Sequence, residues 1–151
     1  MSKLVQRLRE AFALVNATFT TTSTSAVTVT GLTFNVNSSE VWVVEAKLTA
    51  QCSSTGGIGY AVAAPSGSTI EGWVWSSTSA VMTLLYQRLT AINTLTATAL
   101  HTVATTPAPD RVYFTVTAGA AGVVSLQVAS KTSGQTTTVF ANSSMIARRA
   151  M

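Results

Sequence analysis

Few side chains in this sequence of 151 residues could take part in catalysis. There is one histidine, His101, and one cysteine, Cys52, so no disulfide can form within the chain. A nucleophilic triad would need a serine beside His101 and Asp110, but no Gly-x-Ser-x-Gly turn is present to expose one. We therefore interpret His101 as a strand residue without a catalytic role.

The sequence also offers few residues for acid–base catalysis, metal binding or phosphate binding. Glu45 and Glu71 would form a glycosidase pair only if the fold brought them together; each is otherwise a surface charge or a partner of Lys47 or Arg88. One histidine, one cysteine and five scattered carboxylates offer no metal-ligand set. The glycine-rich stretch at 56–59 lacks the Lys-Ser/Thr of a phosphate loop. We expect no metal, no cofactor and no enzyme activity, a cell-wall hydrolase included.

Aromatic residues could form a binding site without catalysis. Trp73 and Trp75 are two residues apart, so their rings would lie on the same side of a strand. Tyr60 and Trp42 could join them. Exposed in a row, the rings would bind sugars by stacking, whereas buried rings would fill the core or an interface between subunits. The shortage of other large core residues favours the second interpretation, and the first stays open.

The composition indicates a protein whose surface is covered by partners. Charged residues make up only 9% of the chain, against about 25% in ordinary soluble proteins. Thr, Ser, Ala and Val are abundant, and the β-branched Thr and Val fit strands better than helices. A monomer needs more charge than this to stay apart from its copies.

The net charge of +4 lies at the two ends of the chain. The body is neutral, and the excess comes from Lys3, Arg7 and Arg9, offset by Glu10, at the start and from Arg148 and Arg149 at the end. Nucleic-acid binding would need basic residues clustered with aromatics along a groove, so we expect no nucleic-acid partner. The sequence shows no signal peptide and no apolar stretch long enough for a membrane span, which predicts assembly in the cytosol and no membrane partner.

An amphipathic helix is predicted over residues 2–15. Its apolar stripe consists of Leu4, Leu8, Ala11, Phe12 and Val15. A helix of this length is marginal alone in water, so the stripe would pack on its own domain or on a neighbouring subunit. In the second case Leu4, Leu8, Phe12 and Val15 would anchor an adjacent chain. The basic residues Lys3, Arg7 and Arg9 would then meet an acidic surface.

After Asn16 the apolar residues alternate with a period of two, which predicts strands. We place these strands at 26–30, 33–36, 41–52, 58–64, 69–76, 81–90, 95–103, 111–117, 123–130 and 136–140. Residues 80–102 are ambiguous, because 81–86 also fit a helix. The predicted fold is an all-β, antiparallel, jelly-roll-like β-sandwich over 17–147. A helical arm at 1–16 precedes it, and a basic tail at 148–151 follows.

Several segments resemble a known family. Gly31-Leu-Thr-Phe-Asn-Val36, the strand at 41–48 and the loop and strand at 53–67 resemble the Thr/Ala-rich β-sandwich domains of tailed-phage virion proteins, found in head decoration, tail and fibre components. Residues 111–116 and 123–129 resemble their closing hairpin. The resemblance covers about residues 26–130. It implies a jelly-roll-like fold that often forms trimers, and it implies no catalytic residues.

We therefore expect a bacteriophage virion structural protein, assembled in the host cytoplasm. The predicted role is a capsid decoration or cement protein that binds the head lattice as a homotrimer, with the major capsid protein or another virion protein as partner. The alternative is a receptor- or glycan-binding module of a tail or head fibre. That module would expose Tyr60, Trp73 and Trp75 in a groove, whereas a decoration protein would bury them in the core or between subunits.

Overall fold

A computed structural model describes residues 9–53, 56–77, 84–97 and 106–150 of the chain. These residues form eleven strands and contain no helix. The strands are β1 (Glu10–Leu14), β2 (Phe19–Thr21), β3 (Val27–Val36), β4 (Val41–Cys52), β5 (Ile58–Ala63), β6 (Thr69–Ser77), β7 (Leu84–Leu89), β8 (Ala108–Thr117), β9 (Gly122–Ser130), β10 (Thr137–Val139) and β11 (Ser144–Arg149).

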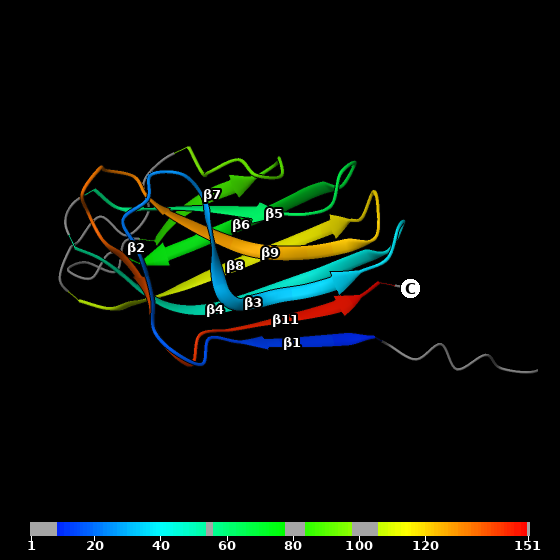
Figure 1. Cartoon of the computed structure of the whole chain (residues 1–151), viewed down its shortest axis with the longest axis horizontal. Coiled ribbons are helices and arrows are strands. Elements are labelled where there is room, and N and C mark those ends of the chain that lie inside the picture. Colours follow the sequence, from blue (N-terminus) through cyan, green and yellow to red (C-terminus); the bar gives the residue numbers. More distant parts are fainter. Residues whose placement is uncertain (1–8, 54–55, 78–83, 98–105, 151) are drawn as a thin grey trace, which may run out of the picture.

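The strands form two antiparallel sheets packed face to face (Figure 1). The large sheet has the order β1-β11-β4-β8-β6-β7, and β10 pairs with the far end of β4 and with β2. The small sheet has the order β3-β9-β5. This arrangement confirms the predicted all-β, antiparallel β-sandwich.

Alternation along the strands builds the core between the two sheets. On β4, Trp42, Val44 and Leu48 are buried, while the residues between them face outward. β8 alternates in the same way, with Phe114 among its buried residues. The small sheet contributes Leu32, Phe34, Tyr60, Val62 and Leu126 to the same core. One continuous core therefore joins both sheets.

The predicted N-terminal helix is wrong in its described part. Glu10–Leu14 form β1, which pairs with β11 along its whole length. The apolar residues of this segment fit the period of a helix and also that of a strand. In the strand, Ala13 and Val15 are buried on one side, and Phe12 is exposed on the other. Pairing with β11 supplies backbone hydrogen bonds and burial that a marginal helix would not gain. Residues 2–8 of the predicted helix lie outside the described residues.

The predicted basic tail is also wrong, because its arginines belong to a strand. Arg148 and Arg149 end β11 and pair with acids of neighbouring strands and loops. Arg148 Nη2 lies 3.3 Å from Glu10 Oε1, and Arg149 Nη1 lies 3.2 Å from Glu40 Oε1. The sequence also predicted a strand at 95–103, but residues 95–97 are not in a strand and 98–103 lie outside the described residues. The stretch 84–89, ambiguous in sequence, is strand β7.

The two short strands predicted on either side of Gly31 form a single long strand in the structure. β3 continues from Val27 to Val36, but its register against β9 shifts between Thr28 and Thr33. Gly31 has a φ of 94°, and a Cβ atom there would lie 2.3 Å from the carbonyl oxygen of Leu14. Only glycine lets β3 bend and pass the end of β1 at this distance.

We predict that Gly31→Ala destabilises the fold by about 2 kcal/mol or more, because the new methyl group meets backbone and a positive φ. Thermal or denaturant unfolding measures the effect. Gly134→Ala is the matched control: its φ is 76°, yet its Cβ would meet nothing within 4 Å. An equal loss in both variants would show that φ alone, and not the contact with β1, sets the requirement for glycine.

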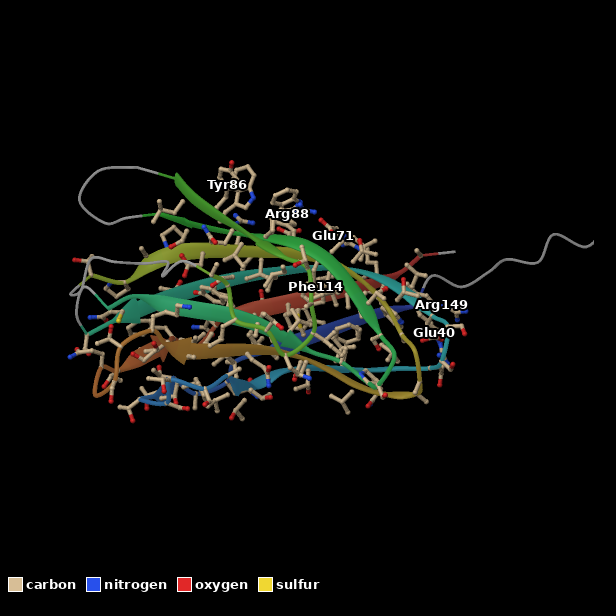
Figure 2. All side chains as sticks on the ribbon, turned by 90° about the horizontal axis from the view of Figure 1, so that it is seen from above. Glu40, Glu71, Tyr86, Arg88, Phe114 and Arg149 are labelled. Carbon is tan, nitrogen blue, oxygen red and sulfur yellow. The ribbon has the colours of Figure 1, made fainter. Side chains whose placement is uncertain are left out.

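Glu40 forms ion pairs at the start of β1 and at the end of β11, and Figure 2 shows it beside Arg149. It is 6% exposed and accepts hydrogen bonds from the backbone N–H of Asn37 at 2.9 Å and from Trp42 Nε1 at 3.0 Å. Arg149 from β11 lies 3.2 Å away, and Arg9, just before β1, lies 3.5 Å away. The hydrogen bonds from Asn37, helped by Trp42 and the Arg149 charge, lower the pKa of Glu40 from 4.5 to about 2.

This lowered pKa predicts a loss of stability in acid. The ionised Glu40 stabilises the fold above pH 4.5, and its contribution disappears as the pH falls toward 2. We expect Glu40→Gln to lower the free energy of unfolding by about 2 kcal/mol at pH 7, and this gap to shrink to less than half of that by pH 2.5, where Glu40 is partly protonated in the folded protein. Unfolding curves at the two pH values measure the gap. The control Glu10→Gln removes a half-exposed ion pair and should cost less than about 1 kcal/mol; a gap for Glu40→Gln that does not change with pH would contradict the assignment.

Candidate binding face

The outer face of the large sheet, turned away from the small sheet, carries side chains aligned in rows across six strands. Strand register fixes these rows, because opposed residues of antiparallel strands point to the same side. The first row runs from β1 to β7 through Phe12, Ile146, Glu45, Tyr113, Trp73 and Arg88. The second row runs through Leu14, Ser144, Lys47, Arg111, Trp75 and Tyr86.

Four aromatic side chains gather at the β7 end of these rows. This aromatic cluster consists of Trp73, Trp75, Tyr86 and Tyr113, which are 40%, 47%, 66% and 39% exposed. On β6 the intervening Val74 is buried, so alternation turns both tryptophans outward. Figure 2 shows Tyr86, Arg88 and Glu71 projecting from this outer face, whereas Phe114 points between the sheets.

The rings of the cluster are tilted against one another and leave a hollow. The ring centroids of Trp73 and Tyr86 are 6.3 Å apart, with an angle of 60° between their planes. The guanidinium of Arg88 lies 5.3 Å from the centre of the Trp73 ring and covers part of it. Trp73, Trp75 and Tyr86 line a shallow hollow of about 360 Å³. A second hollow of about 260 Å³, on the β4 side, shares Trp73 with it.

The charges around the cluster are paired within the chain. Arg88 pairs with Glu71, and Arg111 Nη1 lies 2.9 Å from Glu45 Oε1. Lys47 Nζ lies 3.7 Å from the same carboxylate oxygen. Of the two alternatives left open for these glutamates, a lone surface charge or an ion pair, the structure shows ion pairs: Glu71 with Arg88, and Glu45 with Lys47 and Arg111. The two acids belong to separate ion pairs, so this face presents aromatic rings among charges that are paired within the chain.

Tyr60 does not join the aromatic cluster, and neither does Trp42. Tyr60 is fully buried, and its hydroxyl donates a hydrogen bond to the carboxylate of Asp110 on β8 across the core. Burial, and then the Asp110 charge, raise the pKa of Tyr60 well above 10. Trp42 is 3% exposed and donates its indole N–H to Glu40. Tyr60 is therefore buried in the core, as the interpretation favoured from the sequence expected, and is not exposed in a groove as the glycan-binding alternative required, because β5 turns it into the sandwich.

The predicted partner-binding arm is only partly described. Leu4, Arg7 and Leu8 lie outside the described residues, as does His101. Val15 is fully buried in the domain's own core and cannot bind another chain. Phe12 is 65% exposed, but it stands on a strand at the edge of the large sheet and not on a helix.

Sequence reasoning missed Tyr86 and Tyr113 as members of the cluster. Tyr113 lies between the buried Val112 and Phe114, whereas Tyr86 lies between the half-buried Leu85 and Gln87. That signal places Tyr113 on the outer side of its strand. No local pattern in the sequence indicates which strands pair with β6 or in which register.

Among the described residues, no group of three or more His, Cys, Asp or Glu side chains lies together as a metal site would require. The same part of the chain contains no helix long and apolar enough to cross a membrane.

No protein-family model and no curated protein sequence matches this chain. Among solved structures it is similar to the Eiger TNF of S. frugiperda, with 10% identity, a TM-score of 0.53, and coverage of 95% of this chain and 93% of that one. A structure of carbohydrate-binding modules of the β-sandwich superfamily has 10% identity, a TM-score of 0.30, and coverage of 83% and 56%. The VP2 subviral particle of infectious bursal disease virus has 10% identity, a TM-score of 0.24, and coverage of 97% and 38%.

The last two similarities are too weak to bear on fold or function, and none of the three identifies a tailed-phage family. The first extends over nearly the full length of both chains and concerns the fold alone. By this comparison the chain is an all-β sandwich that shares its overall arrangement of strands with the Eiger TNF structure.

Proposed function

We propose that this chain is a non-catalytic structural protein of a bacteriophage particle, a jelly-roll-like decoration or cement protein that binds the head lattice as a homotrimer. The observation that carries the proposal is the aromatic cluster exposed on the outer face of the large sheet. In this function the cluster is a protein-binding surface, and the partners are other copies of the chain and the major capsid protein or another virion protein.

The chemistry of the outer face supports a protein partner. Trp and Tyr are the residues most enriched where protein interfaces gain their binding energy. Burying them gains about 25 cal/mol for each Å² of apolar surface removed from water. The neighbouring ion pairs Arg88–Glu71 and Arg111–Glu45 satisfy each other within the chain. A partner can therefore cover the rings without leaving a lone charge in the contact.

The scarcity of reactive groups supports a non-catalytic role. The one histidine in the sequence is His101, and the one cysteine, Cys52, is buried. Asp110, the acid considered for a triad, is buried and accepts the hydrogen bond from Tyr60. Glu45 and Glu71 are held by Arg111 and Arg88 in separate pairs, which does not match the paired acid and base of a glycosidase.

A glycan-binding module of a tail or head fibre is the second candidate, because Trp73 and Trp75 are exposed side by side. Three features of the cluster fit a protein better. Arg88 already covers part of the Trp73 ring. The Trp73 and Tyr86 planes are inclined by 60°, which is not a flat platform for a sugar ring. The hollow is lined by three aromatic residues and by no side chain that could take several sugar hydroxyls at once.

Binding to phage heads assembled without this protein distinguishes the two candidates. We expect the wild-type protein to occupy such heads, and the double variant Trp73→Ala, Trp75→Ala to bind at least tenfold more weakly, because the aromatic contact is lost. Quantitative gel densitometry of sedimented heads measures the occupancy. The control Val123→Ala removes an exposed apolar side chain of the small sheet and should bind normally.

A different pattern of binding would support the glycan-binding function. If the wild-type protein left the heads bare and bound host cell-surface polysaccharide, and if the double variant lost only that binding, the glycan-binding function would replace the structural one.

A further inference from the structure

We propose that the hollow of the aromatic cluster is filled by a second copy of this chain, with Phe12 of one copy inserted between Trp73, Trp75 and Tyr86 of the next. The inference rests on the proposed function in one respect, that the outer face binds protein. It adds which protein the cluster binds and through which side chain.

Phe12 has the properties of an inserting side chain. It stands on β1, the edge strand of the large sheet, and is 65% exposed although its neighbours Ala11 and Ala13 face the core. A large apolar ring exposed at a sheet edge gains from burial by a partner. The edge position also lets the ring reach another molecule without a clash between the bodies of the two sandwiches.

The hollow has the size and chemistry to receive a phenyl ring. Its volume is about 360 Å³, whereas a cavity of about 150 Å³ is enough for benzene. Trp73 and Tyr86 already pack at an inclined angle with centroids 6.3 Å apart. An inserted ring would continue the tilted packing that aromatic side chains prefer.

The two parts lie at opposite edges of the same face, so one chain cannot join them. Phe12 is on β1 at one end of the strand order, and Tyr86 is on β7 at the other end (Figure 1). The contact must therefore form between copies and must join two different patches. A contact of this kind repeats from copy to copy and closes into a ring when the rotation allows it. In a cyclic oligomer with one such contact between each pair of neighbours, every Phe12 is inserted and every hollow is filled.

The charges near the two patches are compatible with this contact. Glu10 lies two residues before Phe12 on the same side of β1, and Arg148 lies opposite it on β11, 3.3 Å from its carboxylate. At the other edge, Arg88 and Arg111 stand opposite Trp73 and Trp75 in the strand register. In both patches the charges are already paired within the chain, Glu10 with Arg148, Arg88 with Glu71 and Arg111 with Glu45, so the contact buries no charge that lacks a counter-ion.

The mass of the purified protein, without phage heads, tests the contact. We expect the wild-type protein to form one cyclic oligomer. Phe12→Ala and Tyr86→Ala should each dissociate it with at least a tenfold weaker association, because each removes one side of the same contact. Sedimentation equilibrium measures the association, and circular dichroism checks that each variant is folded. The control Val123→Ala should keep the mass of the wild-type oligomer.

Mixing the two variants tests whether the contact joins different patches. A Phe12→Ala chain keeps an intact hollow, and a Tyr86→Ala chain keeps an intact Phe12, so the mixture should form heterodimers with one complete contact. A chain carrying both Phe12→Cys and Tyr86→Cys, with Cys52→Ser, should oxidise into covalent oligomers that end at the mass of the ring. Cross-links between two Phe12→Cys positions, or no heterodimer, would overturn the proposal.

The outcomes separate this inference from the proposed function. A monomeric wild-type protein, or an oligomer that both substitutions leave intact, would overturn the Phe12 contact while head binding is unaffected. An oligomer that dissociates as expected but does not occupy phage heads would uphold the contact and refute the decoration function.

Discussion

The binding face and the core both depend on the antiparallel register of β6 between β7 and β8. Because side chains alternate along a strand, this pairing turns Val74 into the core and both Trp73 and Trp75 to the outer face. The same register sets Tyr113 and Tyr86 beside them, one from each neighbouring strand. A shift by one residue would bury the tryptophans and expose Val74, so the same register determines both the binding face and the core.

The ends of the chain complete the sheet that carries this face. β1 and β11 extend it beyond β4, and Glu40 holds Arg9 and Arg149 at their ends. Gly31 lets β3 pass close to β1 on the other layer. Segments distant in sequence therefore make one continuous outer face, with Phe12 at one edge and the aromatic cluster at the other. The sparse charges on that face are paired within the chain, which leaves the rings as its main binding feature.

The sequence predicted strands wherever alternation was strong and local. β4, with Trp42, Val44 and Leu48 on one side, lies where it was expected, and Trp73 and Trp75 do share a side. Alternation could not decide which side of β6 is buried, because that depends on which sheet lies above it. It also failed at Glu10–Leu14, whose spacing fits a helix and a strand equally well until β11 is present to pair with it. The sequence left both burial and exposure open for Tyr60 for a related reason: nothing local shows that β5 directs it toward Asp110.

Hydroxyl-radical footprinting of the native protein, read residue by residue by mass spectrometry, tests the central claim most directly. If the outer face is covered by protein, Trp73, Trp75 and Tyr86 should be oxidised several-fold more slowly in the native assembly than in chains dissociated by dilution. Val123, exposed on the small sheet, should react equally in both. Equal oxidation of the three rings in the native and dissociated protein would contradict the claim that this face is covered by a protein partner.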